Sequence, residues 1–110
     1  MAGKFDLKKT PKGKFMFNLK AGNGQVILTS EMYDSKPAAK KGIAAVQKNA
    51  ANDKRYERKT SKKGQPYFVL KSGNSQVIGK SAMYASVAGM ENGVASVKTN
   101  GPAGAIADNT

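Results

Sequence analysis

The side chains that most often perform catalysis are scarce in this sequence. It contains no histidine and no cysteine, which excludes histidine-dependent triads, thiol nucleophiles and the usual structural zinc sites. A serine nucleophile would need another base, such as a lysine, beside it. The sequence therefore predicts a protein that is not an enzyme and that carries no cofactor and no metal ion.

Carboxylates are the remaining acid–base candidates. The seven acidic residues are Asp6, Glu31, Asp34, Asp53, Glu57, Glu91 and Asp108. Only Asp6 and Glu57 occupy matching places in two similar halves of the chain. A glycosidase-like pair needs two converging carboxyl groups in different environments, whereas these two lie in lysine-rich segments. We interpret them as solvated or ion-paired residues, and an enzyme with a carboxylate-based site is the third hypothesis for function.

A glycine-rich segment, Gly22-Asn23-Gly24, resembles the start of a dinucleotide-binding motif. Ile27 stands where that motif needs its third glycine, and a strand-like run follows where the motif needs a helix. We therefore expect a turn and no phosphate-binding loop. The second half has Gly73-Asn74-Ser75 at the matching place. Because serine avoids positive φ, a shared turn conformation would place the positive φ angles at the glycine and asparagine positions.

The chain is strongly basic. Nineteen lysine and arginine residues face seven acidic ones, for a net charge of +12. Such a charge attracts polyanions, including nucleic acid, acidic lipid and acidic protein. Lysine also keeps small β proteins in solution and discourages strand edges from pairing, and this interpretation is favoured. Sequence-nonspecific nucleic-acid binding through a basic surface is the alternative to a small non-enzymatic binding or interaction module.

A sheet face without helices is the best candidate for a binding surface. If the apolar residues of segment 15–19 face the core, Met16 and Lys20 point away from it, as do Tyr67 and Lys71 in the second half. Aromatic and basic side chains on an open sheet could stack on and clamp single-stranded nucleic acid. The full candidate set is Lys12, Met16, Lys20, Tyr33, Lys63, Tyr67, Lys71 and Tyr84. The structural alternatives are ordinary exposed surface or a homotypic contact for the sheet residues, and packing at the helix entrance for the two other tyrosines.

The chain contains an internal repeat. A shift of 51 residues aligns residues 5–50 with residues 56–101 without a gap, with 19 identities among the 46 pairs. The identities include turn glycines, apolar strand residues and Ser35, which matches Ser86. Two copies are too few for a solenoid, so they indicate a pseudo-dimer within one chain.

Each repeat predicts three strands and a helix. Apolar and polar residues alternate in segments 5–7 and 15–19, and residues 25–29 are rich in β-branched side chains. A helix is expected to begin after Ser35, whose hydroxyl can cap it, and to end at about Asn49. Glycine recurs in the middle of both helices and indicates close approach of helix and sheet. An extended segment follows each helix, at residues 54–58 and at residues 105–107.

Neither repeat is long enough to stand alone. A unit of about 50 residues buries too little surface without disulfides, metals or a partner, and the missing cysteines exclude disulfides. The core is therefore expected to form by packing one half on the other. We expect a monomer, because the tandem repeat acts as an internal pseudo-dimer.

Several motifs together resemble the YegP-like family of small bacterial proteins of uncharacterised function. They are the run Lys20–Ile27, the segment Ser30–Tyr33 and the run Ser35–Ile43, and the resemblance covers essentially the whole chain twice. The resemblance implies an α+β fold of two tandem β-β-β-α-β repeats. In that fold the repeats share one antiparallel sheet, the closing strands are exchanged between repeats, and the helices pack on one face. This chain departs from the family at its end, where the closing strand at residues 105–107 is short.

We therefore predict a single domain over residues 1–110. Its repeats lie at about 5–51 and 56–102, with a closing strand at about 104–108. Residues 1–6 show no signal peptide and no stretch is long and apolar enough to span a bilayer, so we expect a soluble cytoplasmic protein without membrane insertion.

Overall fold

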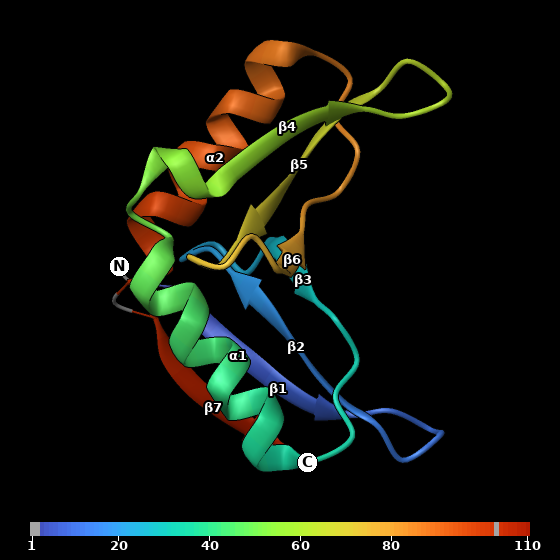
Figure 1. Ribbon diagram of the computed structural model, residues 1–110, viewed down its shortest axis with the longest axis vertical. Helices are drawn as coiled ribbons and strands as arrows, with labels where there is room; N and C mark the ends of the chain where they lie inside the picture. Colours follow the sequence, from blue (N-terminus) through green and yellow to red (C-terminus); the bar gives the residue numbers. More distant parts are fainter. Residues whose placement is uncertain (1–2, 103) are drawn as a thin grey trace.

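The computed structural model describes residues 3–102 and 104–110, which form a seven-stranded sheet with two long helices (Figure 1). The elements of the first half are β1 (Lys4–Lys9), β2 (Phe15–Lys20), β3 (Val26–Ser30) and α1 (Lys36–Asn49). A short 3-10 helix, η1 (Asp53–Arg55), leads into the second half. There the elements are β4 (Tyr56–Thr60), β5 (Pro66–Lys71), β6 (Val77–Lys80), α2 (Val87–Asn100) and β7 (Ala105–Asn109). The structure confirms the predicted α+β fold class.

The sheet is mixed, which corrects the predicted antiparallel sheet at one edge. The strands lie in the order β4-β5-β6-β3-β2-β1-β7, and β7 runs parallel to β1 with Phe5 opposite Ile106. The other pairs are antiparallel. Strand β7 runs opposite to β6, the strand that precedes its helix, and this direction makes it parallel to β1, the strand beside which it lies at the edge of the sheet.

The closing strands are exchanged between the repeats. Strand β7 follows α2 of the second repeat but pairs with β1 of the first, over five positions from Lys4 to Lys8. The segment after α1 becomes β4, which pairs with β5 of the second repeat. The exchange agrees with the prediction, and β7 extends two residues beyond the predicted segment 105–107.

An approximate twofold axis relates the repeats and passes between β3 and β6. Thr29 pairs with Lys80, its own counterpart under the 51-residue shift. Next to it, a Cβ on Gly79 would lie 2.7 Å from Leu28, which is also its counterpart. At the helix ends a Cβ on Gly101 would lie 2.6 Å from the Cβ of Ala50. At Gly79 and at Gly101 the second repeat has glycine because the matching residue of the first repeat, Leu28 or Ala50, occupies the space that a side chain would need.

Each helix begins as predicted and packs on strands of both repeats. The Ser35 hydroxyl accepts a hydrogen bond from the Ala38 N–H at 3.2 Å, and Ser86 accepts one from Gly89 at 3.0 Å. Helix α1 contacts β2, β5 and β6, whereas α2 contacts β2, β3 and β5. The core therefore belongs to both repeats. Among the described residues, neither helix has the length and apolar character needed to cross a bilayer.

Glycine in the middle of each helix admits a tyrosine ring between helix and sheet. Tyr33 stacks on Phe17, with ring centroids 6.3 Å apart. A Cβ on Gly42 would collide with the Tyr33 hydroxyl and approach the Phe17 ring to 3.1 Å. Gly93 and Tyr84 repeat this arrangement. The predicted close approach is confirmed, with the tyrosine as the group that requires it.

The turn before β3 differs from its prediction. Positive φ occurs at Gly24 (85°) and at Ser75 (69°), the third turn position, and not at the glycine and asparagine before them. The asparagines act through their side chains: Oδ1 of Asn23 accepts the Gln25 N–H at 3.0 Å, and Asn74 accepts that of Gln76 at 3.2 Å. This side-chain bond stabilises a three-residue hairpin loop whose last residue is left-handed.

We expect alanine at Gly42 to destabilise the fold by about 1–3 kcal/mol, because the added methyl group overpacks the tyrosine layer. Alanine at Gly89 is the control, since a Cβ there meets only ordinary contacts from 3.4 Å outward. Gly89→Ala should stabilise the protein by up to about 1 kcal/mol through helix propensity. Urea unfolding measures both changes, and equal effects at the two positions would contradict the packing explanation.

The seam between the repeats gives a second prediction. Leu28→Ala should cost about 2–5 kcal/mol by leaving a cavity, and Gly79→Ala should cost about 1–3 kcal/mol by overpacking. Because the two positions share one space, the Leu28→Ala/Gly79→Ala double variant should be more stable than the sum of the single effects implies. A double-mutant cycle measured by urea unfolding tests this. Strict additivity would show that the two residues do not compete.

Candidate functional site

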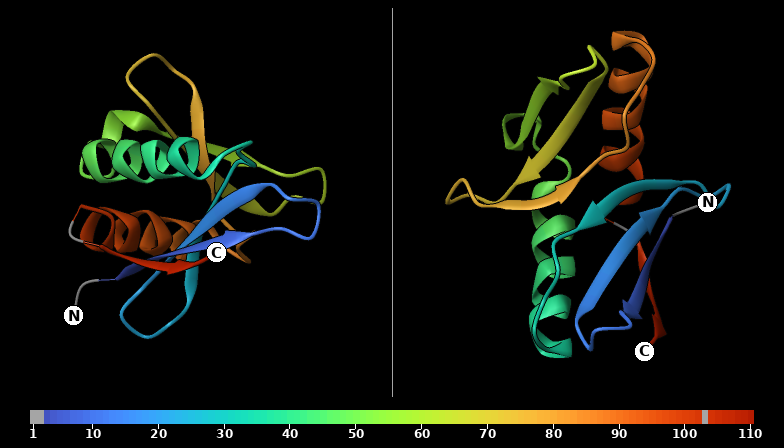
Figure 2. Two further views of the ribbon diagram at one scale, coloured as in Figure 1. Left: turned by 90° about the horizontal axis from the view of Figure 1, so that it is seen from below. Right: turned by 90° about the vertical axis from the view of Figure 1, so that its right-hand side faces the viewer.

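One face of the sheet lies under the helices, and the opposite face carries none (Figure 2). We call this second surface the open face. The strand register aligns its side chains in rows, and one row reads Asp6, Asn18, Thr29, Lys80, Val69 and Glu57 from β1 to β4. The lysines of the open face are Lys4, Lys8, Lys20, Lys59, Lys71 and Lys80. Together with the two carboxylates of the row, these six lysines give the open face a net charge of +4.

Two lysine–carboxylate clusters occupy matching places on the open face. Asp6 lies between Lys8 and Lys20, with Oδ2 at 3.4 Å and 3.2 Å from the two ammonium groups. Glu57 pairs in the same way with Lys59, at 3.5 Å, and with Lys71. Each carboxylate therefore holds two lysine side chains in place while these side chains stay partly exposed, from 30% to 45%.

The two carboxylates differ in their surroundings because only β1 is covered by β7. The Asp6 side chain is 8% exposed and accepts a hydrogen bond from the Asn109 amide, whereas Glu57 is 41% exposed. Burial raises the pKa of Asp6, but hydrogen bonds from Asn109, Lys20 and Lys8 outweigh it, so the pKa lies below its usual value. The hydrogen bond from Lys71 lowers the pKa of Glu57 as well. Both groups are thus stabilised as carboxylates.

An aromatic ring and a lysine lie near the centre of the open face. Lys80, on the approximate twofold axis, places its ammonium group 5.1 Å from the centre of the Tyr67 ring. Tyr67 is half-buried and pairs across the strands with Lys59, and its counterpart Met16 pairs with Lys8. The open face therefore combines cations with one flat aromatic surface.

The structure brings four of the eight predicted site residues together. Met16, Lys20, Tyr67 and Lys71 share the open face, as the alternation predicted. Lys12 and Lys63 lie instead in the β1–β2 and β4–β5 loops, which project from opposite ends of the molecule (Figure 1).

Tyr33 and Tyr84 lie on the helix side of the sheet. Each ring stacks on a core phenylalanine beneath the helix, and burial raises the pKa of both hydroxyl groups. Both tyrosines therefore pack at the helix entrance, which was the alternative to a binding role in the sequence analysis, and they lie apart from the open face.

Lys4 and Lys80 belong to the open face although the sequence did not single them out. Both lie at strand ends, where alternation is weakest, and neither has a lysine counterpart in the other repeat. Their place depends on cross-strand register: Lys4 lies opposite Lys20, and Lys80 lies between Thr29 and Val69. A correct strand order would have been needed to find them.

The acidic residues are dispersed. Asp6 and Glu57 lie five strands apart in the row, which corresponds to roughly 24 Å at the usual strand spacing. Over residues 3–102 and 104–110, no three acidic side chains gather in a way that would hold a metal ion.

Comparison with known proteins gives a family and close relatives. The family model described as "Domain of unknown function (DUF1508)" matches twice, at residues 11–57 and 61–108. The chain is 53% identical to the UPF0339 protein YegP of Escherichia coli K12, with both chains covered in full. It is 48% identical to a UPF0339 protein of Acinetobacter baylyi, covering 100% of this chain and 99% of that one.

Two solved structures have the same fold. The solution NMR structure of the protein of unknown function yegP from E. coli superposes with a TM-score of 0.95 at 53% identity, covering 100% of this chain and 95% of that chain. The NMR structure of a UPF0339 protein from Shewanella oneidensis gives a TM-score of 0.92 at 47% identity, covering 98% and 92%.

The environment of Asp6 predicts a pH effect. Because folding lowers its pKa, the ionised carboxylate stabilises the fold above the unfolded-state pKa of about 3.9. That contribution is lost as the pH falls through the lower folded-state pKa. We expect Asn109→Ala to raise the pKa of Asp6 toward its usual value and to leave that of Glu57 unchanged, as measured by NMR titration of the carboxyl carbons. An Asp6 pKa at or above its usual value in the unsubstituted protein would contradict this.

Proposed function

The chain belongs to the DUF1508 family, in the tandem form with two repeats, and from this premise we propose that it is a non-enzymatic binding module whose open face binds single-stranded nucleic acid. The observation that carries the proposal is the set of six lysines on a helix-free sheet face, four of them held by Asp6 and Glu57. Such a surface would contact phosphates along a strand without reading its sequence.

The positions of the lysines favour binding over mere solubility. Lysine protects sheet edges from pairing, and this role accounts for Lys59 on the edge strand β4. It does not account for Lys20, Lys71 and Lys80, which lie on interior strands. There the backbone is already paired on both sides, so a cation adds nothing to edge protection. A ligand with repeated negative charges gives these interior lysines a role.

Tyr67 favours a single strand over a duplex. An unpaired base can stack on an aromatic ring, whereas the bases of a duplex are stacked on one another. The ring lies on the open face with Lys80 beside it, so one base could stack while lysines contact the neighbouring phosphates. One aromatic ring against six lysines supports binding that is mainly electrostatic and therefore independent of sequence.

The carboxylates support a role without catalysis. A general acid or base works best with a pKa near the operating pH, and the pKa values of Asp6 and Glu57 are shifted the other way, below their usual values. Their separation of roughly 24 Å also exceeds the spacing of about 5–9.5 Å between the carboxyl groups of glycosidases. We propose that they position lysines.

Binding should depend steeply on salt. A net charge of +4 on the open face predicts a slope of about −3 for log K against log salt concentration with a single-stranded oligonucleotide. Fluorescence anisotropy with a labelled oligonucleotide measures this slope. Lys20→Ala/Lys71→Ala should reduce it to about −1.5, because two positive charges leave the face. Tyr67→Ala should weaken binding by about 1–3 kcal/mol with little change in slope.

A matched control separates the open face from net charge. Lys40→Ala/Lys41→Ala removes the same two charges from exposed positions on α1, on the helix side, and should leave the slope near −3. If both double variants lower the slope equally, the charge acts through the whole molecule and the open face is not the site. No binding at low salt would exclude the proposal altogether.

A further inference from the structure

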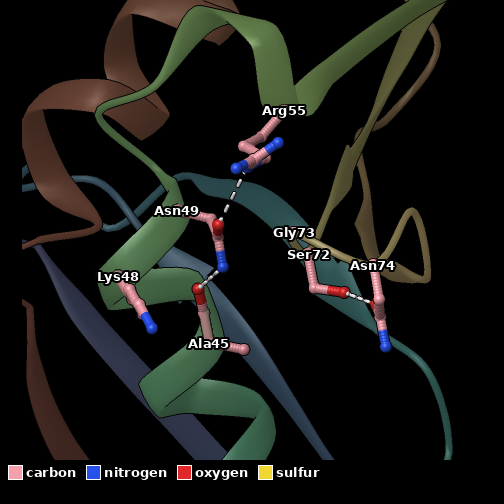
Figure 3. A pocket seen from close by; sticks show the side chains of 7 residues that line it. All are labelled: Ala45, Lys48, Asn49, Arg55, Ser72, Gly73 and Asn74. Carbon is pink, nitrogen blue, oxygen red and sulfur yellow. Dashed lines mark hydrogen bonds between the residues drawn. The ribbon is translucent and has the colours of Figure 1, made fainter.

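We propose that a second site, in a pocket beside the C-terminal half of α1, binds a phosphomonoester group. The pocket has a volume of about 340 Å³ and opens to solvent (Figure 3). It is lined by Ala45, Lys48, Asn49, Arg55, Ser72, Gly73 and Asn74. These residues come from α1, from η1 and from the β5–β6 turn, so the pocket forms only when the two repeats are folded together.

Arg55 is held in place by a buried amide. Its Nε donates a hydrogen bond to Oδ1 of Asn49 at 3.2 Å, and Nδ2 of Asn49 donates to the Ala45 carbonyl at 2.8 Å (Figure 3). Asn49 is only 8% exposed, so its orientation is fixed by the helix. With Nε engaged, the guanidinium group still has its terminal N–H groups for a ligand. A planar, fixed guanidinium suits the two oxygens of a phosphate.

The β5–β6 turn supplies further donors next to Arg55. The backbone of Gly73 lies next to Arg55, since a Cβ there would make an ordinary contact at 3.6 Å with a terminal nitrogen of the guanidinium group. The turn's own hydrogen bonds run from Ser72 N–H to the Gln76 carbonyl and from Ser75 N–H to the Ser72 carbonyl. They do not use the N–H groups of Gly73 and Asn74, which therefore remain as donors at the rim of the pocket.

The cations of this pocket have no carboxylate partner. Within the described residues, neither Arg55 nor Lys48 forms an ion pair, and the pocket lining contains no acidic residue. The neighbouring Arg58 contrasts with them, because it pairs with both Asp53 and Glu91. Two unneutralised positive charges in a small pocket match the double negative charge of a phosphomonoester.

The other repeat keeps the frame of this site and lacks its charges. Asn100 matches Asn49 and donates to the Ser96 carbonyl at 2.8 Å, as Asn49 does to Ala45. The counterparts of Lys48 and Arg55 are Thr99 and Ile106. The asparagine is thus part of the repeated fold, whereas both cations belong to the first repeat alone. We therefore infer one phosphate site per chain, and the inference does not depend on the proposed function of the open face.

The test is an NMR titration of the full chain with inorganic phosphate at constant ionic strength. We expect saturable shifts of the Gly73 and Asn74 amides and of the Arg55 Nε–H signal. The double variant Lys48→Thr/Arg55→Ile installs the residues of the other repeat and should bind phosphate at least about ten-fold more weakly. Lys48→Thr alone changes an exposed side chain and should weaken binding several-fold, which keeps the test valid if the double variant is unstable. Lys62→Ala, in an exposed loop, should bind like the unsubstituted protein.

Oligonucleotides with and without a 5′-phosphate identify the source of the phosphate group and separate the two sites. If the terminal phosphate of a strand is the ligand, the 5′-phosphorylated oligonucleotide should bind more tightly than its unphosphorylated counterpart, and the pocket variant should remove this difference. If small phosphate esters are the ligands, glycerol phosphate should shift the pocket signals while the two oligonucleotides bind equally. Phosphate shifts spread over the open-face lysines, or shifts unchanged in the pocket variant, would overturn the proposal whatever the outcome for the open face.

Discussion

Close to a twofold axis a residue packs against its own counterpart from the other repeat. The packing at the centre of this molecule depends on how these pairs of counterparts fit together. Two copies of Leu28 could not share the space where β3 lies against β6, and the second repeat has Gly79 there. The same solution recurs where Gly101 lies against Ala50 at the helix ends. A symmetric dimer of identical chains would need one residue type that fits against itself at each place. Fusion into one chain permits a large residue on one side and glycine on the other, so the seam can be packed without a void.

This packed seam allows each helix to cover strands of both repeats, which neither repeat could achieve alone. About 50 residues expose too much surface for an independent core, and here the buried residues of both halves form one cluster. The two edges of the sheet show that a residue's burial depends on whether a further strand covers it. Leu7 on β1 is fully buried next to β7, whereas its counterpart Arg58, on the uncovered edge strand β4, is exposed and pairs with Asp53 and Glu91. One added strand thus decides whether the same position holds leucine or arginine.

Features that depend on neighbours in the chain could be predicted from the sequence. Alternation placed Met16 and Lys20 on the open face, and Ser35 marked the start of α1. The exchange of the closing strands, which the family resemblance implied, was confirmed, but other features that depend on distant pairing were missed or predicted wrongly. The parallel direction of β7 follows from its place beside β1, and the place of Lys80 follows from the β3–β6 register. The prediction of positive φ at Gly73 and Asn74 was also wrong, because the Asn74 side chain, and not its backbone conformation, stabilises that turn, and the positive φ lies at Ser75.

The two candidate sites use the repeat in opposite ways, and this difference bears on what each can bind. The clusters around Asp6 and Glu57 occur in both repeats, so the open face presents similar charge groups twice about one axis. A ligand that is itself repetitive, such as a nucleic-acid backbone, can contact both groups at once and gains from the duplication. The pocket at Arg55 occurs once, because the other repeat has isoleucine in its place. A single charged group needs only one such pocket, and a second copy would add no contact to it. In a dimer of identical chains every substitution appears twice, whereas in a fused chain a substitution in one repeat leaves the other unchanged. A site that occurs only once can therefore arise on a fold that is built from two repeats.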